Sequence, residues 1–298
     1  MKEFLYYQHC RHFPMLLDLP DKCGGIDRSS DVFLLLVVKS APNNYDRREI
    51  LRRTWAEERQ QNGVWIKRVF IVGTNGSGFE RERLNKILDL ERSHYKDILQ
   101  WDFGDTFQNL TLKQVLFFEW MERNCPKARF LFNGDDDVFV NTNNVVKYLQ
   151  SLEDNDGSKH LYTGYCMGGR TVIRAQSSKY FVPVKLYKPS QYPPYCSGGG
   201  FILSGYSALV IYNMSQSISL ISIDDAYIGM CLAKAGLGFR SHKGFKAIGV
   251  HVPSVRIDAY DPCFHKELLV VHGFLPQKLY YMWHKVTDPN LKCFGNYK

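Results

Sequence analysis

The chain has 298 residues, of which 45% are hydrophobic and 23% are charged, and its formal net charge is +8. This length suits one large domain or two closely merged halves, and the near-average composition excludes a disordered, collagen-like or coiled-coil protein. The longest apolar run, Val32 to Val38, has seven residues, so we expect no helix of the ~20 residues that span a membrane. The basic residues are scattered among acidic ones without a recognised motif, so we expect no nucleic-acid partner.

Strands and helices are predicted in alternation along the first half of the chain. Residues 1–30 contain prolines and glycines but no sustained hydrophobic period, so we expect an irregular N-terminal segment there. The continuous apolar run at 32–38 is typical of a central strand that is covered on both faces. After it the pattern predicts a helix at 46–59, a strand at 69–72, a helix at 81–94, a strand at 98–101, a helix at 110–123 and a strand at 130–132.

The second half has a less regular pattern, because prolines break up residues 183–195 and three consecutive glycines follow. Neither an internal repeat nor a linker separates the halves, so residues 31–298 are expected to form one domain on a shared sheet. The whole pattern predicts an α/β fold with a mostly parallel central sheet covered by helices, in which ligands bind beyond the carboxyl ends of the strands. The predicted elements of the second half are helices at 205–214, 225–235 and 277–286 and a strand at 268–272.

The eight cysteines contain no C-x-x-C pair, which excludes a zinc-ribbon or thioredoxin-like site. An even number of cysteines without metal-binding spacing favours disulfides and an oxidising compartment. From their positions we expect a Cys10–Cys23 bond and a Cys263–Cys293 bond.

Three N-x-S/T sequons, at Asn75, Asn109 and Asn213, agree with a passage through the secretory pathway, where we expect them to carry glycans. The first ten residues lack the apolar stretch of a signal peptide. Because a lumenal chain needs a signal or an anchor, we expect that this N-terminal segment is absent from the chain.

Three adjacent carboxylates, Asp135, Asp136 and Asp137, come just after the predicted strand at 130–132. Their mutual repulsion is costly unless a cation compensates, and hard oxygen ligands suit Mg²⁺ or Mn²⁺ bridging to phosphate oxygens. A calcium-binding EF-hand loop is excluded, because its fifth and sixth positions would be Phe139 and Val140. The other interpretation is a solvated acidic turn, and the apolar residues on both sides argue against full solvation.

Four further segments each allow a structural and a functional interpretation. Four arginines between residues 47 and 53 fit a site for a small anionic ligand such as a diphosphate. Asp224 and Asp225 can cap a helix, or one of them can point into a cleft. The run 192–201 is either a plain turn before a strand or a wall of aromatics and glycines against a sugar. A lone His272 at the end of a buried strand is more often a satisfied core residue than a metal ligand.

Taken together, these segments resemble the β1,3-glycosyltransferase family of the Golgi, and the closest resemblance is to its N-acetylglucosaminyl branch of the core 1 O-glycan-extending type. Phe107 and Ala226 depart from the residues that are usual in the family, and neither change removes a catalytic group. The matching stretches are Arg47–Trp55, Asp102–Lys113, Asp135–Phe139, Tyr192–Phe201, Asp224–Gly229 and Val271-His272.

The resemblance implies a GT-A fold and an inverting, metal-dependent transfer of GlcNAc from UDP-GlcNAc to the 3-hydroxyl of a galactose on a glycoprotein glycan. It also implies Mn²⁺ as the cofactor, a location in the Golgi lumen, and attachment to the membrane only through an N-terminal anchor that this chain lacks. The alternatives are a β1,3-galactosyltransferase that uses UDP-Gal and a non-catalytic lumenal carbohydrate-binding protein.

The resemblance also assigns roles to individual residues. Asp225 is the expected general base, and its place at a helix start leads us to expect a lowered pKa. Residues 31–160 are expected to form the nucleotide-sugar half and residues 161–298 the acceptor half. The expected metal ligands are Asp135, Asp137 and His272. The expected donor-binding residues are Lys39, Arg47, Asp102 and Asp136. The expected wall of the sugar site comprises Tyr192, Tyr195, Gly198, Gly199, Gly200 and Asp224.

Overall fold

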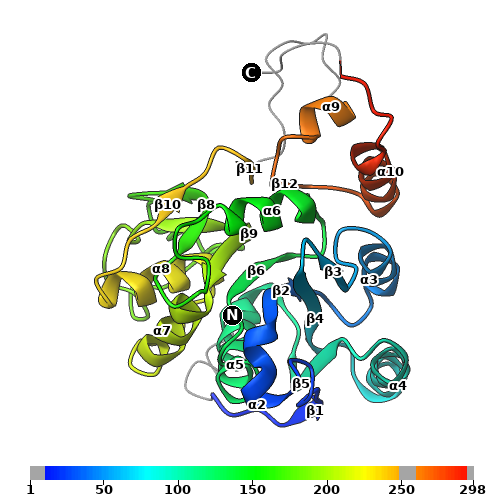
Figure 1. Cartoon of the computed structure of the whole chain (residues 1–298). Helices are drawn as coiled ribbons and strands as arrows, with labels where there is room; N and C mark the ends of the chain where they lie inside the picture. The colour runs from blue at the N-terminus through cyan, green and yellow to red at the C-terminus, as the bar shows by residue number, and fades with distance from the viewer. Residues whose placement is uncertain (1–10, 248–259, 294–298) are drawn as a thin grey trace.

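The computed structural model describes residues 11–247 and 260–293, and it shows a central sheet flanked by helices (Figure 1). The sheet has nine strands in the order β1-β5-β4-β2-β6-β9-β8-β10, and β3 pairs with β4 outside this path. The neighbours β5, β4, β2 and β6 are parallel, as are β8 and β10. The α/β class with a mostly parallel sheet, predicted from the alternating pattern, is therefore confirmed. The strands are β1 (Met15–Leu17), β2 (Val32–Lys39), β3 (Arg59–Gln61), β4 (Val64–Thr74), β5 (Ile98–Gly104), β6 (Phe130–Asp135), β8 (Tyr162–Met167), β9 (Tyr195–Ser204) and β10 (Arg240–Ser241).

Strand β2 lies at the centre of the first half and is buried along its whole length. Its side chains alternate between the two faces of the sheet, so Leu35 and Val37 enter one hydrophobic cluster while Leu34 and Leu36 enter the other. A strand with apolar contacts on both faces explains the continuous apolar run in the sequence.

Helices cover both faces of the sheet. On one face α5 (Leu110–Asn124), α7 (Gly205–Ser215) and α8 (Asp224–Lys234) pack against one another. On the other face the apolar cluster includes residues of α3 (Tyr45–Arg52), α4 (Gly78–Tyr95), α6 (Thr142–Gln150) and α10 (Pro276–Thr287). In the described part of the chain, none of the helices is long and apolar enough to cross a membrane.

The second half joins the same sheet through β9, which pairs antiparallel with both β6 and β8. A smaller sheet forms beside it from β11 (Phe245–Lys246), β12 (Val270–His272) and β7 (Val138–Val140). In this small sheet β12, from the C-terminal part of the chain, lies next to β7, which follows β6 directly. The short helix α9 (Pro262–His265) precedes β12 and is capped by the Asp261 side chain, which accepts a hydrogen bond from the Cys263 N–H.

Several boundaries differ from the sequence-based prediction. Helix α3 ends at Arg52 rather than near residue 59, because the chain turns there and buries Trp55 against Phe132. Helix α6 and strand β8 were not predicted. Most of the run 192–201, for which a turn and a sugar-facing wall were the two interpretations, belongs to strand β9.

The N-terminal segment is less irregular than predicted, because β1 pairs with β5 and the helices α2 (Gly25–Arg28) and η1 (Ser29–Asp31) lead into β2. The predicted Cys10–Cys23 bond is wrong, since Cys23 is bonded to Cys125 at the end of α5. Cys10 itself lies outside the described residues. The predicted Cys263–Cys293 bond is confirmed. A third disulfide joins Cys166 in β8 to Cys196 in β9, and the pairing of these two strands brings the cysteines together.

Candidate active site

The acidic loop lies at the carboxyl end of β6, where the sheet topology places ligand sites. Asp135 is the last residue of β6, and the chain turns immediately into β7. Strand β12 runs antiparallel to β7 and places His272 opposite Val138. The carbonyl oxygen of Asp137 accepts hydrogen bonds from the N–H groups of Gly273 and Phe274, which fix the loop against the end of β12.

This arrangement brings together the three predicted metal ligands. One ligand atom each from Asp135, Asp137 and His272 lies within 4.8 Å of the others. The Nε2 atom of His272 is 3.4 Å from Oδ1 of Asp137. That oxygen is buried and accepts no hydrogen bond within the described part of the chain. A buried carboxylate oxygen that accepts no hydrogen bond from the described residues, beside an imidazole and a second carboxylate, fits a divalent cation site.

The three members of the cluster differ in their electrostatics, and without a cation only Asp137 has a pKa shifted toward its metal-binding form. Burial raises the pKa of Asp135, and Lys39 opposes the shift without cancelling it. For Asp137, burial acts to raise the pKa, but the contact with His272 and the charge of Arg47 outweigh it and lower the pKa. The contact with Asp137 in turn raises the pKa of His272. A bound cation would replace the His272 proton as the positive partner of Asp137.

Lys39, at the end of β2, connects the acidic loop to helix α8. Its Nζ donates to the carbonyl of Gly198 at 3.1 Å and to Oδ2 of Asp224 at 2.8 Å, and it lies 3.0 Å from Oδ1 of Asp135. Burial acts to lower the pKa of Lys39, but the two carboxylates outweigh it and raise the pKa. The ammonium is therefore a permanent positive charge between the two acidic groups of the site.

Asp225 is the second residue of helix α8, directly after Asp224, and backbone groups orient its carboxylate. Oδ2 accepts from the Gly198 N–H at 3.1 Å, and Oδ1 accepts from the Ala226 N–H at 2.7 Å. The expectation of a lowered pKa at the helix start is wrong. Burial, reinforced by the charge of Asp224, raises the pKa of Asp225 to about 7. A carboxylate with such a pKa is a competent proton acceptor near neutral pH.

The four arginines between residues 47 and 53 do not come together in one anion-binding site. Only Arg47 faces the acidic loop, with Nη1 at 3.4 Å from Asp136 and at 3.8 Å from Asp137. Arg48 and Arg52 are buried in ion pairs with Glu91, at 2.6 and 2.7 Å. The diphosphate site predicted for all four arginines is therefore reduced to Arg47, because two of the others support the fold and Arg53 is largely exposed on the surface.

Asp136 turns away from its two neighbours and binds the chain after β2. Its Oδ2 accepts from Ser40 Oγ at 2.7 Å and from Asn44 Nδ2 at 2.8 Å. These contacts satisfy the carboxylate within the protein. Asp136 therefore orients Asn44 and Arg47 toward the cleft.

The metal-ligand cluster and the other charged groups that face it line one open cleft of about 630 Å³. These groups are Lys39, Arg47, Asp135, Asp136, Asp137, Asp224, Asp225 and His272. Sequence reasoning missed part of this lining. Ser40 and Asn44 follow the carboxyl end of β2, where ligands bind in this type of fold, so they could have been predicted. Lys179 and Tyr180 come from a long loop whose sequence contains no motif that would indicate a binding site. The missed lining residues include Ser40, Asn44, Asp105, Phe107, Lys113, Lys179 and Tyr180.

Several predicted residues lie elsewhere. Asp102 pairs with Arg81 in a neighbouring pocket of about 270 Å³. Tyr192 and Tyr195 are buried in the hydrophobic cluster behind β9, where Tyr192 stacks on Tyr187 with ring centroids 5.3 Å apart. The structure therefore does not place these three residues in the cleft.

The glycines of β9 allow contacts within the protein. A Cβ on Gly199 would lie 3.0 Å from the ring of His272, and one on Gly200 would lie 2.9 Å from Val270. A Cβ on Gly198 would reach Asp225 at 3.4 Å. Because these glycines have no side chains, β9 can lie close both to His272 in the candidate metal site and to the carboxylate of Asp225.

The sequons differ in accessibility. Asn75 and Asn213 are exposed. Asn109 is buried, and its Nδ2, the atom to which a glycan would be attached, donates to the carbonyl of Gly104 at 2.8 Å. We therefore keep only Asn75 and Asn213 as proposed glycan sites.

A parallel sheet with a carboxylate and imidazole cluster at its carboxyl edge, and a separate carboxylate with a raised pKa in the same cleft, defines an α/β group-transfer enzyme. Comparisons with known proteins identify the family. The profile described as "Galactosyltransferase" matches residues 46–243. The chain belongs to this family and is a glycosyltransferase, which confirms the resemblance seen in the sequence.

The similarity to individual relatives extends over nearly the whole chain. The human N-acetyllactosaminide beta-1,3-N-acetylglucosaminyltransferase 3 is 48% identical, over 99% of this chain and 77% of its own. The human acetylgalactosaminyl-O-glycosyl-glycoprotein beta-1,3-N-acetylglucosaminyltransferase is also 48% identical, over 98% of this chain and 75% of its own. The rat UDP-GlcNAc:betaGal beta-1,3-N-acetylglucosaminyltransferase 7 is 42% identical, over 98% of this chain and 72% of its own.

Proposed function

We propose that the protein transfers GlcNAc from UDP-GlcNAc to the 3-hydroxyl of a galactose at the end of a glycan on a glycoprotein, with inversion at the anomeric carbon. The observation that carries this proposal is the cleft in which Asp225 and the cluster of Asp135, Asp137 and His272 lie together. The names of three relatives that share 42–48% of their residues with this chain support the donor and the linkage.

Asp225 accepts the proton in this mechanism. The oxygen of the acceptor 3-hydroxyl attacks C1 of GlcNAc while its proton passes to Asp225, and the electrons of the breaking C1–O bond remain on the departing UDP. The hydrogen bonds from Gly198 and Ala226 fix the carboxylate before the acceptor binds. Fixed geometry reduces the entropy that must be lost on reaching the transition state.

Asp135, Asp137 and His272 would hold a divalent cation, and the family resemblance favours Mn²⁺. Such an ion would neutralise the charge that develops on the leaving diphosphate. Arg47 lies beside the same loop and is oriented by Asp136, so its guanidinium adds a fixed positive charge on the donor side. Lys39 keeps Asp135 and Asp224 in place and prevents their mutual repulsion from opening the site.

We further propose that the protein works in the lumen of the Golgi. The three disulfides among the described residues suit an oxidising compartment. The exposed Asn75 and Asn213 suit the glycosylation machinery of the same pathway. An N-terminal membrane anchor outside this chain belongs to the same proposal.

The test is a donor and acceptor screen with the purified protein in the presence of MnCl₂. UDP-GlcNAc and UDP-Gal are each offered with a core 1 O-glycan and with N-acetyllactosamine, and the products are identified by mass spectrometry. We expect GlcNAc to be transferred, and we expect Asp225→Asn to lower kcat on the order of 10²–10⁴-fold. Transfer of galactose alone would replace the proposal by the β1,3-galactosyltransferase alternative. Sugar binding without any product would favour the non-catalytic alternative.

A further inference from the structure

The backbone that orients Asp225 belongs to an irregular part of β9. The register between β8 and β9 shifts between the pairs Gly164–Phe201 and Cys166–Cys196, so residues 197–200 bulge out of this ladder. On the other side, β6 pairs with β9 only as far as Gly200. Three of the four bulged residues are glycines, which have no side chain to restrict their backbone. The Gly198 N–H that contacts Asp225 therefore needs support from outside the bulge.

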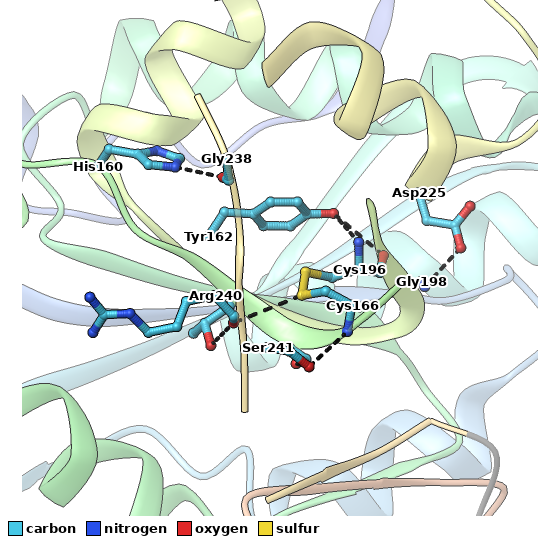
Figure 2. The surroundings of a disulfide bond; sticks show 11 residues. His160, Tyr162, Cys166, Cys196, Gly198, Asp225, Gly238, Arg240 and Ser241 are labelled. Atoms are coloured by element: carbon cyan, nitrogen blue, oxygen red, sulfur yellow. Dashed lines mark hydrogen bonds between the residues drawn. A yellow bond between two sulfur atoms is a disulfide. The ribbon is translucent and has the colours of Figure 1, made fainter. Parts of the chain in front are cut away.

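That support lies on the far side of the bulge, at Cys196 (Figure 2). The hydroxyl of the buried Tyr162 accepts a hydrogen bond from the Cys196 N–H at 2.7 Å and donates one to the Cys196 carbonyl at 3.4 Å. The disulfide to Cys166 holds the side chain of the same residue. Both polar groups of the Cys196 backbone and its sulfur are thus fixed two residues before Gly198.

We propose that Tyr162 and the Cys166–Cys196 disulfide position the general base by fixing the start of the β9 bulge. Neither group contacts the reacting atoms. They act through the backbone between Cys196 and Gly198, whose N–H orients Asp225 and whose carbonyl accepts from Lys39. The inference rests on the proposed role of Asp225 and adds to it two positioning elements from β8.

The decisive variant is Tyr162→Phe, which removes the hydroxyl and keeps the ring that packs edge-to-face on Phe201 at 5.6 Å. We expect kcat to fall on the order of tenfold while KM for UDP-GlcNAc stays within about twofold, because a misplaced base slows chemistry more than donor binding. The acid limb of the pH profile should also move to higher pH, since a weaker Gly198 hydrogen bond stabilises the ionised carboxylate less.

The position of the acid limb depends on every charged or titratable group near Asp225. Tyr162→Phe removes one of these groups, the phenol of Tyr162. Because burial raises the pKa of this phenol, it is uncharged at neutral pH, and its removal takes no charge away from Asp225. The other groups are unchanged in the variant. The titratable groups that interact electrostatically with Asp225 in the described part of the chain are Asp224, Lys39, Tyr162, Tyr192 and Tyr195.

The matched control is Thr163→Val, in the same strand. Thr163 is also fully buried, and its hydroxyl donates to the carbonyl of Arg240 in β10 at 2.7 Å, on the side away from β9. We expect this variant to lose stability and to keep the wild-type kcat and pH profile. A fall in kcat in Thr163→Val as large as in Tyr162→Phe would overturn the inference, because both losses would then reflect general destabilisation.

The two disulfides with a sequence separation of 30 give a second comparison. Loops of equal length contribute similar chain entropy to stability. The double variant Cys166→Ala/Cys196→Ala should therefore lose kcat, whereas Cys263→Ala/Cys293→Ala should keep it at a temperature where both are folded. Equal kcat values in the two double variants would count against a positioning role for the Cys166–Cys196 bond.

A double-variant cycle separates this inference from the proposed function. If Tyr162 acts through Asp225, Tyr162→Phe should cause no further loss in an Asp225→Asn protein. A wild-type protein without transferase activity would refute the proposed function itself. An active wild type, a strongly impaired Asp225→Asn and an unaffected Tyr162→Phe would refute only the positioning role.

Discussion

Lowering the pH from 8 to 6 should slow the transfer about tenfold if Asp225 is the general base. Burial and the charge of Asp224 raise the pKa of Asp225 to about 7. With that pKa, about 90% of the carboxylate is ionised at pH 8, about half at pH 7 and about 10% at pH 6. Only the ionised form accepts the acceptor proton, so kcat should follow these fractions.

The assay is direct quantification of the trisaccharide product by chromatography, at saturating donor, acceptor and metal between pH 5.5 and 8.5. Asp225→Asn should lower kcat on the order of 10²–10⁴-fold and remove the acid limb. Asp224→Asn should move the limb to lower pH, since it removes a charge that raises the pKa of Asp225. A kcat that is unchanged between pH 6 and 8, or an acid limb that persists in Asp225→Asn, would refute the assignment.

The raised pKa of Asp225 also predicts how the stability of the protein changes with pH. The pKa of Asp225 is higher in the folded protein than in the unfolded chain, so its contribution is most favourable at low pH and is lost as the pH rises through about 7. The melting temperature of Asp225→Asn relative to the wild type should therefore increase from pH 5 to pH 8. A difference that stays constant over this range would show that the ionised carboxylate costs no stability.

Three further outcomes follow from the structure. Treatment with EDTA should abolish turnover, and Asp137→Asn should raise the Mn²⁺ concentration for half-maximal activity at least about tenfold, measured by metal titration; full turnover without metal would contradict the site. Replacing Cys23 and Cys125 by serine should lower the free energy of unfolding by about 4–5 kcal/mol in urea denaturation, and a loss below about 1 kcal/mol would contradict the entropic argument. Asn75→Gln should reduce the mass of the protein secreted from mammalian cells by one glycan, whereas Asn109→Gln should leave it unchanged.

The sequence was most informative where a run of one residue type is compatible with only one kind of environment. The apolar run of β2 predicted a doubly covered strand, and the three adjacent aspartates predicted a cation site at a strand end. His272 could not be placed beside them from physical reasoning alone, because its position depends on the antiparallel pairing of β12 with β7 over a long sequence separation. Only the family resemblance brought it into the site.

The differences between the sequence-based expectations and the structure have a common cause, which is that local patterns carry little information on burial and long-range pairing. Tyr192 and Tyr195 have the composition of a sugar-stacking wall, yet they lie behind β9 in the core. The lowered pKa expected for Asp225 followed from the helix start, whereas burial and the adjacent Asp224 dominate. The pairing of Cys23 with Cys125 follows from the packing of the N-terminal segment near α5, which no spacing rule predicts.

The bond between Cys23 and Cys125 also has a consequence for biosynthesis. Its two cysteines are 102 residues apart and enclose β2, β4 and β5. At ~5–20 residues per second, about 5–20 s pass between the synthesis of the two cysteines, and during that time Cys23 is a free thiol on a growing chain. Cys10 is already present, so a Cys10–Cys23 bridge can form before the native partner exists. Correct maturation then requires thiol–disulfide exchange, and the yield of native enzyme should depend on the isomerase capacity of the compartment in which the chain folds.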